Sequence, residues 1–110
     1  MKKYLILYTW SATAAQQAAR PTPEQGKAVM EAWMAWGKKN GPAIVDFGNP
    51  VTYLMQEPAG SPLGPAKVGG YSILQAESQA ALEELFKGHP HFMSPGATIE
   101  VHEFLPMPGM

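Results

Sequence analysis

The amino-acid sequence predicts an α+β fold of the ferredoxin-like, split βαβ type, with the element order β-α-β-β-α-β and an antiparallel sheet. Three observations carry this prediction. Four segments have the composition or the alternation of β-strands, and two segments between them have the caps and apolar spacing of helices. The chain has 110 residues, which is the length of one domain. We therefore expect residues 1–110 to form a single domain.

The first half of the chain is predicted to contain a strand, a long helix and a short strand. Residues 3–10 are rich in aromatic and apolar side chains, and residues 11–21 should form a loop with about one helical turn. Thr22-Pro23-Glu24 supply an N-cap, a first-turn proline and a carboxylate for a helix that ends at Asn40-Gly41-Pro42. Residues 43–48 form the second strand. The predicted buried stripe of the helix consists of Val29, Met30, Trp33, Trp36 and Gly37.

The second half of the chain repeats this pattern after a long loop. Residues 49–67 contain four prolines and two glycines, and an extra edge strand is expected at 51–56 within them. The third strand is predicted at 69–76, Ser78 caps the second helix, and residues 98–105 alternate as the fourth strand. The second helix should stop before Gly88 and Pro90, and its predicted inward positions are Ala81, Leu82, Leu85 and Phe86.

This order of elements places both helices on one face of the sheet. The other face then needs cover, and a second copy packed sheet against sheet would supply it. We therefore expect a homodimeric α+β barrel with a small, largely apolar cavity that is lined by alternate strand residues and holds an unidentified small molecule.

The composition excludes several classes of function. Eight basic and nine acidic residues give a net charge of −1, so no field attracts nucleic acid or an anionic membrane. The absence of cysteine excludes disulfides, thiolate zinc sites and thiol nucleophiles, and it fits a reducing cytoplasm. No stretch approaches the ~20 apolar residues of a membrane span. We expect a cytoplasmic protein that binds neither nucleic acid nor membrane.

Four short blocks, in this order and spacing, resemble the YCII-related family, also called the DGPF-domain family. The blocks are Gly69-Gly70-Tyr71, Gln75-Ala76-Glu77-Ser78, Gly88-His89-Pro90-His91 and Ile99 to Phe104, and the likeness extends over nearly the whole chain. The resemblance implies a dimeric α+β barrel of bacterial origin. Most members have no assigned activity, a few look like enzymes acting on small ring compounds, and some accompany alternative sigma factors.

The chain departs from that family pattern in two places. Where the Asp-Gly-Pro-Phe motif should stand, the sequence has Leu63-Gly64-Pro65-Ala66. The enzyme-like relatives pair a histidine near the start of the first helix with an aspartate after the second. Here Gln25 and His89 occupy those places, so the dyad of these relatives is not carried over to this chain.

His91 and Asp46 are the candidate catalytic residues. His89 and His91 follow a helix C-terminus, where the dipole should raise the pKa of an imidazole. We expect His89 to cap the helix at the surface, with contact to a ligand as the alternative. His91 either does the same or turns inward with Phe92. Asp46 needs a partner in an apolar strand, and the candidates are His91, Tyr71 or the backbone amides near Gly48.

Further polar and aromatic residues are candidate ligand contacts. Glu100 and His102 share one face of the fourth strand, where they either transfer protons or form an ion pair that fixes the dimer register. Tyr71 offers a hydroxyl group, and Trp10 should border the cavity, whereas Trp33 and Trp36 are predicted core residues.

The histidine spacing and the motifs present predict neither a metal site nor a cofactor. His-Pro-His is poor geometry for one metal ion, and no phosphate-binding glycine loop or flavin fingerprint is present. The sequence therefore predicts a small-molecule-binding dimer with cofactor-free acid/base activity of the lyase or isomerase type. The alternative is a non-catalytic ligand-binding or regulatory dimer associated with transcription control.

Overall fold

The structure, a computed structural model, describes residues 1–11, 22–58 and 66–108 and confirms the predicted α+β fold. The loop expected at 11–21 therefore lies almost entirely outside the described residues, as does part of the loop at 49–67. The strands are β1 (Lys2–Ser11), β2 (Ile44–Asp46), β3 (Ala66–Ala76) and β4 (Ala97–Glu103); the α-helices are α2 (Pro23–Lys39) and α3 (Gln79–Leu85); the 3₁₀ turns are η1 (Gly41–Ala43) and η2 (Pro90–Met93).

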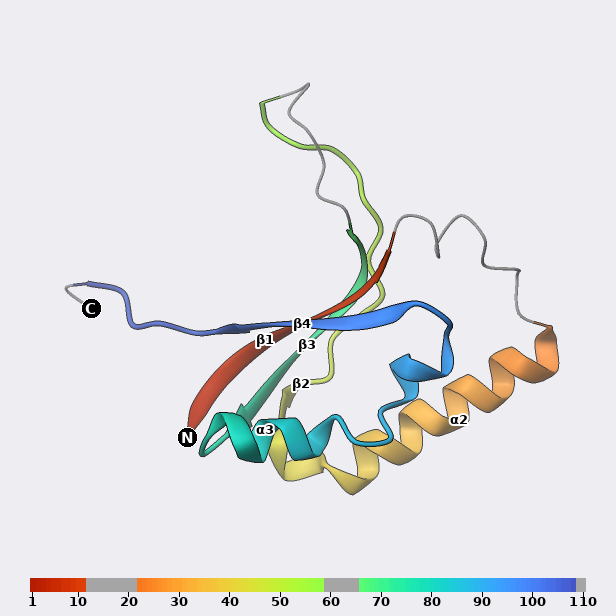
Figure 1. The fold of residues 1–110 in the computed structure, drawn as a ribbon, viewed down its shortest axis with the longest axis horizontal. Helices are drawn as coiled ribbons and strands as arrows, with labels where there is room; N and C mark the ends of the chain where they lie inside the picture. The colour runs from red at the N-terminus through yellow and green to blue at the C-terminus, as the bar shows by residue number, and fades with distance from the viewer. Residues whose placement is uncertain (12–21, 59–65, 109–110) are drawn as a thin grey trace.

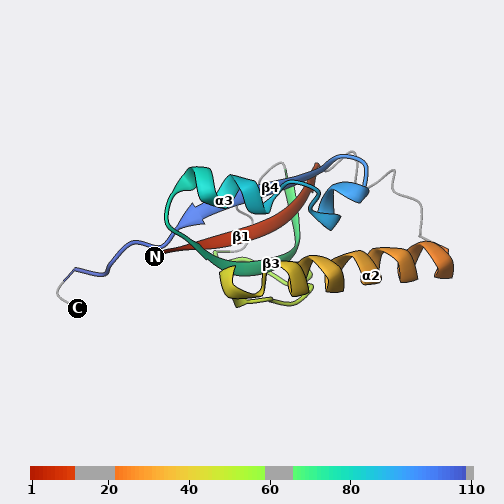
Figure 2. The same cartoon turned by 90° about the horizontal axis from the view of Figure 1, so that it is seen from below.

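The four strands form one antiparallel sheet in the order β2-β3-β1-β4. This is the strand order that the split βαβ arrangement requires, with the first and third strands in the centre. Both α-helices lie on the same face of the sheet, as Figures 1 and 2 show from two directions. The sheet therefore has a helix side and a helix-free face.

The residues of β1 alternate between these two faces. Tyr4, Ile6 and Tyr8 point to the helix side and are buried in the core with Leu74, Ala76, Leu82 and Trp36. Leu5 and Leu7 point to the helix-free face, where Leu5 pairs with Ile73 and His102. Because no helix packs there, these apolar side chains are only half-buried.

Helix α2 begins and ends at the predicted residues. Thr22 and Gln25 form a reciprocal capping box, in which each side chain bonds the backbone of the other, and Asn40 caps the C-terminus. Trp36 is buried, and its indole N–H donates to the carbonyl of Leu85 at 2.9 Å. The predicted stripe is wrong at Met30, which is 62% exposed.

Helix α3 and the segment after β2 differ in detail from the prediction. Ser78 caps α3 as expected, but Ala81 is exposed, whereas Leu82 is buried and Leu85 packs partly buried against the core. The edge strand expected at 51–56 is wrong, because only an isolated bridge joins Pro50 to Gly70. Beyond that bridge the chain leaves the body of the protein in an extended course (Figure 1).

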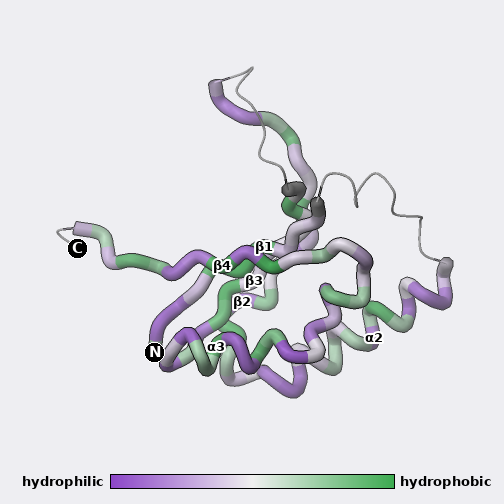
Figure 3. The backbone as a smooth tube through the Cα atoms, viewed as in Figure 1, coloured by the Kyte–Doolittle hydropathy of each residue, from purple (hydrophilic) through white to green (hydrophobic). Residues whose placement is uncertain are grey.

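Two extended segments carry exposed apolar side chains. In Figure 3, hydrophobic residues occur both in the segment after β2 and in the chain that follows β4. Exposed members include Tyr53, Leu54, Met55, Leu105 and Met107. Among the described residues, no helix is long and apolar enough to cross a membrane.

Candidate functional site

A cleft of about 370 Å³ opens on the helix side of the sheet, between α2, the start of β3 and η2. Its walls are largely apolar, and three of the residues that line it have titratable side chains, namely Tyr8, Tyr71 and His91. The apolar lining includes Trp10, Met30, Trp33, Met34, Phe47, Pro50, Gly69, Gly70 and Pro90.

His91 points into the protein from η2, where it is only 3% exposed. Its Nε2 lies 3.0 Å from the carbonyl oxygen of Thr9 and 2.9 Å from that of Thr98. A carbonyl oxygen only accepts hydrogen bonds, so Nε2 must carry the proton that both oxygens share. Burial lowers the pKa of His91, although the two carbonyls act in the opposite direction. The imidazole is therefore neutral at neutral pH, and its Nδ1 holds a lone pair.

The Nδ1 atom of His91 has no hydrogen-bond partner among the described residues. In that part of the chain, no fully buried side-chain nitrogen or oxygen lacks a partner. Nδ1 must therefore be reachable from outside, and the cleft is where His91 meets solvent. Its lone pair is free to accept a proton from a bound molecule.

His89 is also buried, but both of its ring nitrogens are used inside the protein. Its Nδ1 accepts the backbone N–H of His91 at 3.0 Å, so the proton of the neutral ring must be on Nε2. Nε2 lies 3.3 Å from the hydroxyl oxygen of Tyr8, which donates to Ser72 at 2.8 Å. Ser72 donates in turn to the carbonyl of Phe47 at 2.6 Å. This chain of donors leaves His89 no nitrogen for a ligand.

The expectation that His89 lies at the surface is wrong. The ring is 2% exposed and packs among Trp33, Trp36 and Phe86, with a centroid distance of 4.4 Å to Trp36. Burial, together with the nearby His91, lowers its pKa from 6.5 to about 4. The upward shift expected from the helix dipole is therefore wrong for both histidines, because burial outweighs it.

Trp10 lines the cleft on the helix side of the sheet and contacts His91, whereas the cavity expected from the sequence lay between the sheets of two subunits. The two rings meet edge to face, with centroids 4.6 Å apart and an interplanar angle of 73°. On its other side the indole lies against Gly69, where a side chain would collide with the ring. The indole thus fills the space between β3 and the imidazole.

Asp46 and His91 do not come together. A register shift between Ile44 and Asp46 turns the carboxylate to the helix-free face, where Asp46 pairs with Ile73. Its Oδ1 accepts the N–H of Gly48 at 2.9 Å, and its Oδ2 accepts the hydroxyl of Tyr71 at 3.4 Å. Of the partners considered from the sequence, Asp46 therefore has Tyr71 and the backbone, and a catalytic role for it stays a prediction without a cleft contact.

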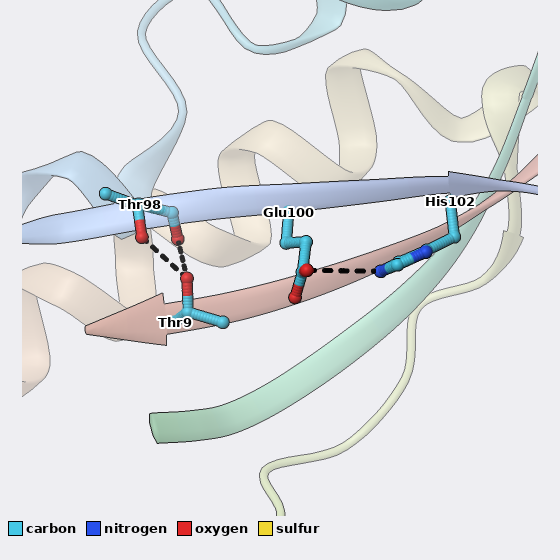
Figure 4. A network of polar contacts seen from close by, with 4 residues as sticks. All are labelled: Thr9, Thr98, Glu100 and His102. Atoms are coloured by element: carbon cyan, nitrogen blue, oxygen red, sulfur yellow. Dashed lines mark hydrogen bonds and ion pairs between the residues drawn. The ribbon is translucent and has the colours of Figure 1, made fainter. Parts of the chain in front are cut away.

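Glu100 and His102 lie on the helix-free face, as expected once Ile99 packs against the core. Their side chains approach to 3.4 Å and each is about half exposed, at 55% and 54%. Figure 4 shows the pair reaching toward each other along β4, with Thr98 farther along the same strand and its hydroxyl bonded to that of Thr9 on β1. Neither residue lines the cleft, and their role in ligand binding stays a prediction.

Two features of the site were missed in the sequence. Tyr8 is the hub of the buried hydrogen-bond chain, yet the sequence marks it only as a strand residue. Gly69 and Gly70 line the cleft, although they were expected to be only a strand start. Two successive glycines inside a strand do signal a bulge or a close approach, and that signal was available. Among the described residues, no cluster of three or more His, Asp or Glu side chains could hold a metal ion.

No family model and no curated protein matches the sequence of this chain. Solved structures do resemble it. The chain is similar to TftG, the 5-chloro-2-hydroxyhydroquinone dehydrochlorinase of Burkholderia phenoliruptrix, in complex with 2,5-dihydroxybenzoquinone. The TM-score is 0.54 and the identity 19%, over 94% of this chain and 93% of that one. A second match is At3g17210 of Arabidopsis thaliana, with a TM-score of 0.47 and 11% identity over 100% and 99% of the chains. The likeness to TftG shows that the two chains share a fold.

Proposed function

We propose that the cleft binds a small, largely apolar ring compound and that His91 accepts a proton from it at Nδ1. One observation carries the proposal: the imidazole of His91, held by two carbonyls through Nε2 and with no partner for Nδ1 among the described residues, lines an apolar cleft. The hydroxyls of Tyr8 and Tyr71 already donate to Ser72 and Asp46. Of the titratable side chains that line the cleft, His91 therefore has the free basic atom.

The chemistry that follows is general base catalysis. Because burial lowers the pKa of His91, the ring is in its basic form at neutral pH and needs no preceding deprotonation. A hydroxyl or an acidic C–H group of the bound ring would give its proton to Nδ1, and release to solvent would restore the base. The imidazole itself takes the proton, so the step requires no cofactor. Lyase and isomerase reactions on hydroxylated rings use such a step.

The nature of the ligand is inferred from the walls of the cleft. Trp10, Trp33 and Phe47 offer aromatic surfaces for a flat molecule, and Gly69 and Gly70 keep β3 free of side chains beside it. TftG places a hydroxylated ring in the same fold, as its name and its bound quinone state. We infer from these features and from the sequence resemblance that the chain is a YCII-related protein with a ring-compound ligand.

The test uses 2-hydroxyhydroquinone, the unchlorinated parent of the compound in the name of TftG, under nitrogen. Binding is followed through the fluorescence of the tryptophans beside the cleft, and proton transfer through exchange of ring hydrogen for deuterium, read by proton NMR in D₂O. We expect the protein to accelerate exchange, and His91→Gln to lower that acceleration by about 10²-fold or more. The glutamine amide can still donate to the carbonyls of Thr9 and Thr98 but offers no basic nitrogen.

The control is Tyr53→Phe, a change at a residue that is 60% exposed and does not line the cleft. It should leave exchange unchanged. Equal exchange in native protein and His91→Gln would refute the role of His91. Tight binding without exchange in either would instead favour the second candidate, a non-catalytic ligand-binding or regulatory dimer linked to transcription control. The favourable observation for that candidate is the near-complete apolar lining of the cleft.

We also propose that a second copy of the chain covers the helix-free face. The support is the half-buried apolar row of Leu5, Leu7 and Ile73, which no helix covers. A homodimer would bring Glu100 and His102 into the interface, where their ion pair could fix the register of the two sheets. Native mass spectrometry of the untagged protein tests this, because a monomer at micromolar concentration would contradict it.

A further inference from the structure

Gly69 lies at an irregularity of the sheet beside the cleft. Tyr8 pairs with Gly70 and Thr9 pairs with Val68, so Gly69 is an extra residue of β3 without a partner in β1. Such β-bulges locally bend a strand and redirect side chains, and they are frequent next to functional sites. The side chain that follows this bulge on the helix side of β1 is Trp10.

The indole of Trp10 occupies the space that a side chain at position 69 would need. A Cβ atom built on Gly69 would overlap Cζ3 of the indole, approach Cη2 to 2.8 Å and approach Cε3 to 3.2 Å. The φ angle of Gly69 is not positive, unlike that of Gly48, Gly88 and Gly96. The backbone at position 69 therefore tolerates an L-residue, and the ring of Trp10 is the obstacle.

The same indole packs against the imidazole of His91, the proposed base. Trp10 and His91 meet edge to face at 4.6 Å, whereas Nε2 of His91 is fixed independently by the carbonyls of Thr9 and Thr98. The rings of Tyr8 and Phe92 also lie beside the imidazole, at 5.2 and 6.1 Å, so Trp10 makes the shortest of its three aromatic contacts. Removing the indole should leave the imidazole attached through Nε2 but less restrained and more open to water.

We propose that Gly69 is a positioning residue. Because it has no side chain, the Trp10 indole has room to pack against His91, and this contact sets the direction of Nδ1 and shields the imidazole from solvent. The expected effect of Gly69 on ligand binding rests on the proposed function. The contact itself is tested separately, by the titration of His91, so the two can fail independently.

The change Gly69→Ala should push the indole away rather than unfold the sheet, because a ring edge moves more easily than a backbone. His91 then keeps its carbonyl partners and loses its shield. The other titratable groups beside the His91 ring are Tyr8, whose ring centroid lies at 5.2 Å, and His89, and the three atoms nearest to a Cβ at position 69 all belong to Trp10. We expect the pKa of His91 to rise toward the ordinary imidazole value, because burial is what lowers it.

The experiment compares the NMR titration of the histidine rings in native protein, Gly69→Ala and Gly41→Ala. Gly41 is the matched control because a Cβ there meets nothing within 4 Å and its φ is not positive. We expect the titration of His91 to move upward in Gly69→Ala alone, and 2-hydroxyhydroquinone to bind about two- to tenfold more weakly. Adding Trp10→Val to Gly69→Ala gives the alanine room, and the double variant should titrate as Trp10→Val does.

Trp10→Val by itself removes the indole without touching β3, and it should raise the pKa of His91 as Gly69→Ala does. This variant keeps the proposal testable if Gly69→Ala does not fold. An unchanged His91 titration in either folded variant would overturn the proposal. If the native protein fails to bind 2-hydroxyhydroquinone while the titration shifts as expected, the positioning role stands and the proposed ligand class is wrong.

Discussion

The surroundings of His89 and His91 differ in a way that burial alone does not show. Both imidazoles are nearly inaccessible, at 2% and 3% exposure, and both have lowered pKa values. His89 uses both ring nitrogens, toward His91 N–H and the Tyr8 hydroxyl, inside a layer of aromatic side chains. His91 uses one ring nitrogen, has no partner for the other among the described residues, and lines the cleft. A free lone pair on a ring nitrogen, rather than the degree of burial, distinguishes the histidine that is available for chemistry.

The largest expected effect is the difference between His89 and His91 in their contribution to the free energy of unfolding. His89→Ala removes a ring packed against Trp33 and Trp36 and leaves the Tyr8 network and the N–H of His91 without a partner. We expect the free energy of unfolding in urea to fall by about 3 kcal/mol. His91→Gln keeps a donor to the same carbonyls and should cost about 1 kcal/mol or less. Equal losses in the two variants would contradict the distinction.

The pH dependence of stability sharpens the same comparison. The native state keeps His89 neutral down to about pH 4, whereas the unfolded chain binds a proton below 6.5. Unfolding therefore takes up a proton between these values, and stability falls as the pH is lowered through this window. The loss attributable to His89 is about 3 kcal/mol, and it levels off below pH 4. Urea titrations of native protein and His89→Phe from pH 7 to pH 4 measure it as the difference between the two slopes, because the lowered pKa of His91 contributes to both.

A smaller effect is expected from the hydroxyl that joins His89 to the sheet. Tyr8→Phe leaves the Nε2–H of His89 without an acceptor, while Ser72 can still donate to the carbonyl of Phe47. We expect a loss of about 1–2 kcal/mol in unfolding free energy. Tyr53→Phe is the matched control, because that residue is 60% exposed and should be neutral. If Tyr8→Phe is as neutral as Tyr53→Phe, the donor chain does not stabilise His89.

The smallest effect is expected on the helix-free face. Glu100 and His102 form a half-exposed pair, so Glu100→Gln should change the stability of the isolated subunit by less than about 0.5 kcal/mol. Dilution to a concentration at which the protein is monomeric provides the reference. A loss well above 1 kcal/mol that disappears on dilution would show that a partner buries the pair.

The fold was predictable because its signals are local. Thr22 with Pro23 predicts the start of the first helix and Ser78 that of the second, and the alternation after Thr98 predicts the fourth strand, in which Ile99 packs against the core. These patterns involve neighbours within a few residues. The errors lie where tertiary contacts decide, as at Met30, which the cleft leaves uncovered.

The site was predictable only in part. His91 was a candidate, although its inward direction comes from the η2 turn, since Phe92 is 49% exposed. The separation of Asp46 from His91 depends on a register shift between β2 and β3, which composition does not encode. The burial of His89 depends on the positive φ of Gly88, at +68°, which turns the chain back toward the aromatic layer. Pairing register and chain reversal are properties of the assembled sheet.

The most direct test of the account is the protonation state of each ring nitrogen of the three histidines, measured by long-range ¹H–¹⁵N NMR at neutral pH. We predict that His89 and His91 are both neutral with the proton on Nε2, and that added 2-hydroxyhydroquinone shifts Nδ1 of His91 and leaves His89 and His102 unchanged. A His91 that is charged, that carries its proton on Nδ1, or that ignores the ligand while another histidine responds would contradict the assignment of His91 as the base.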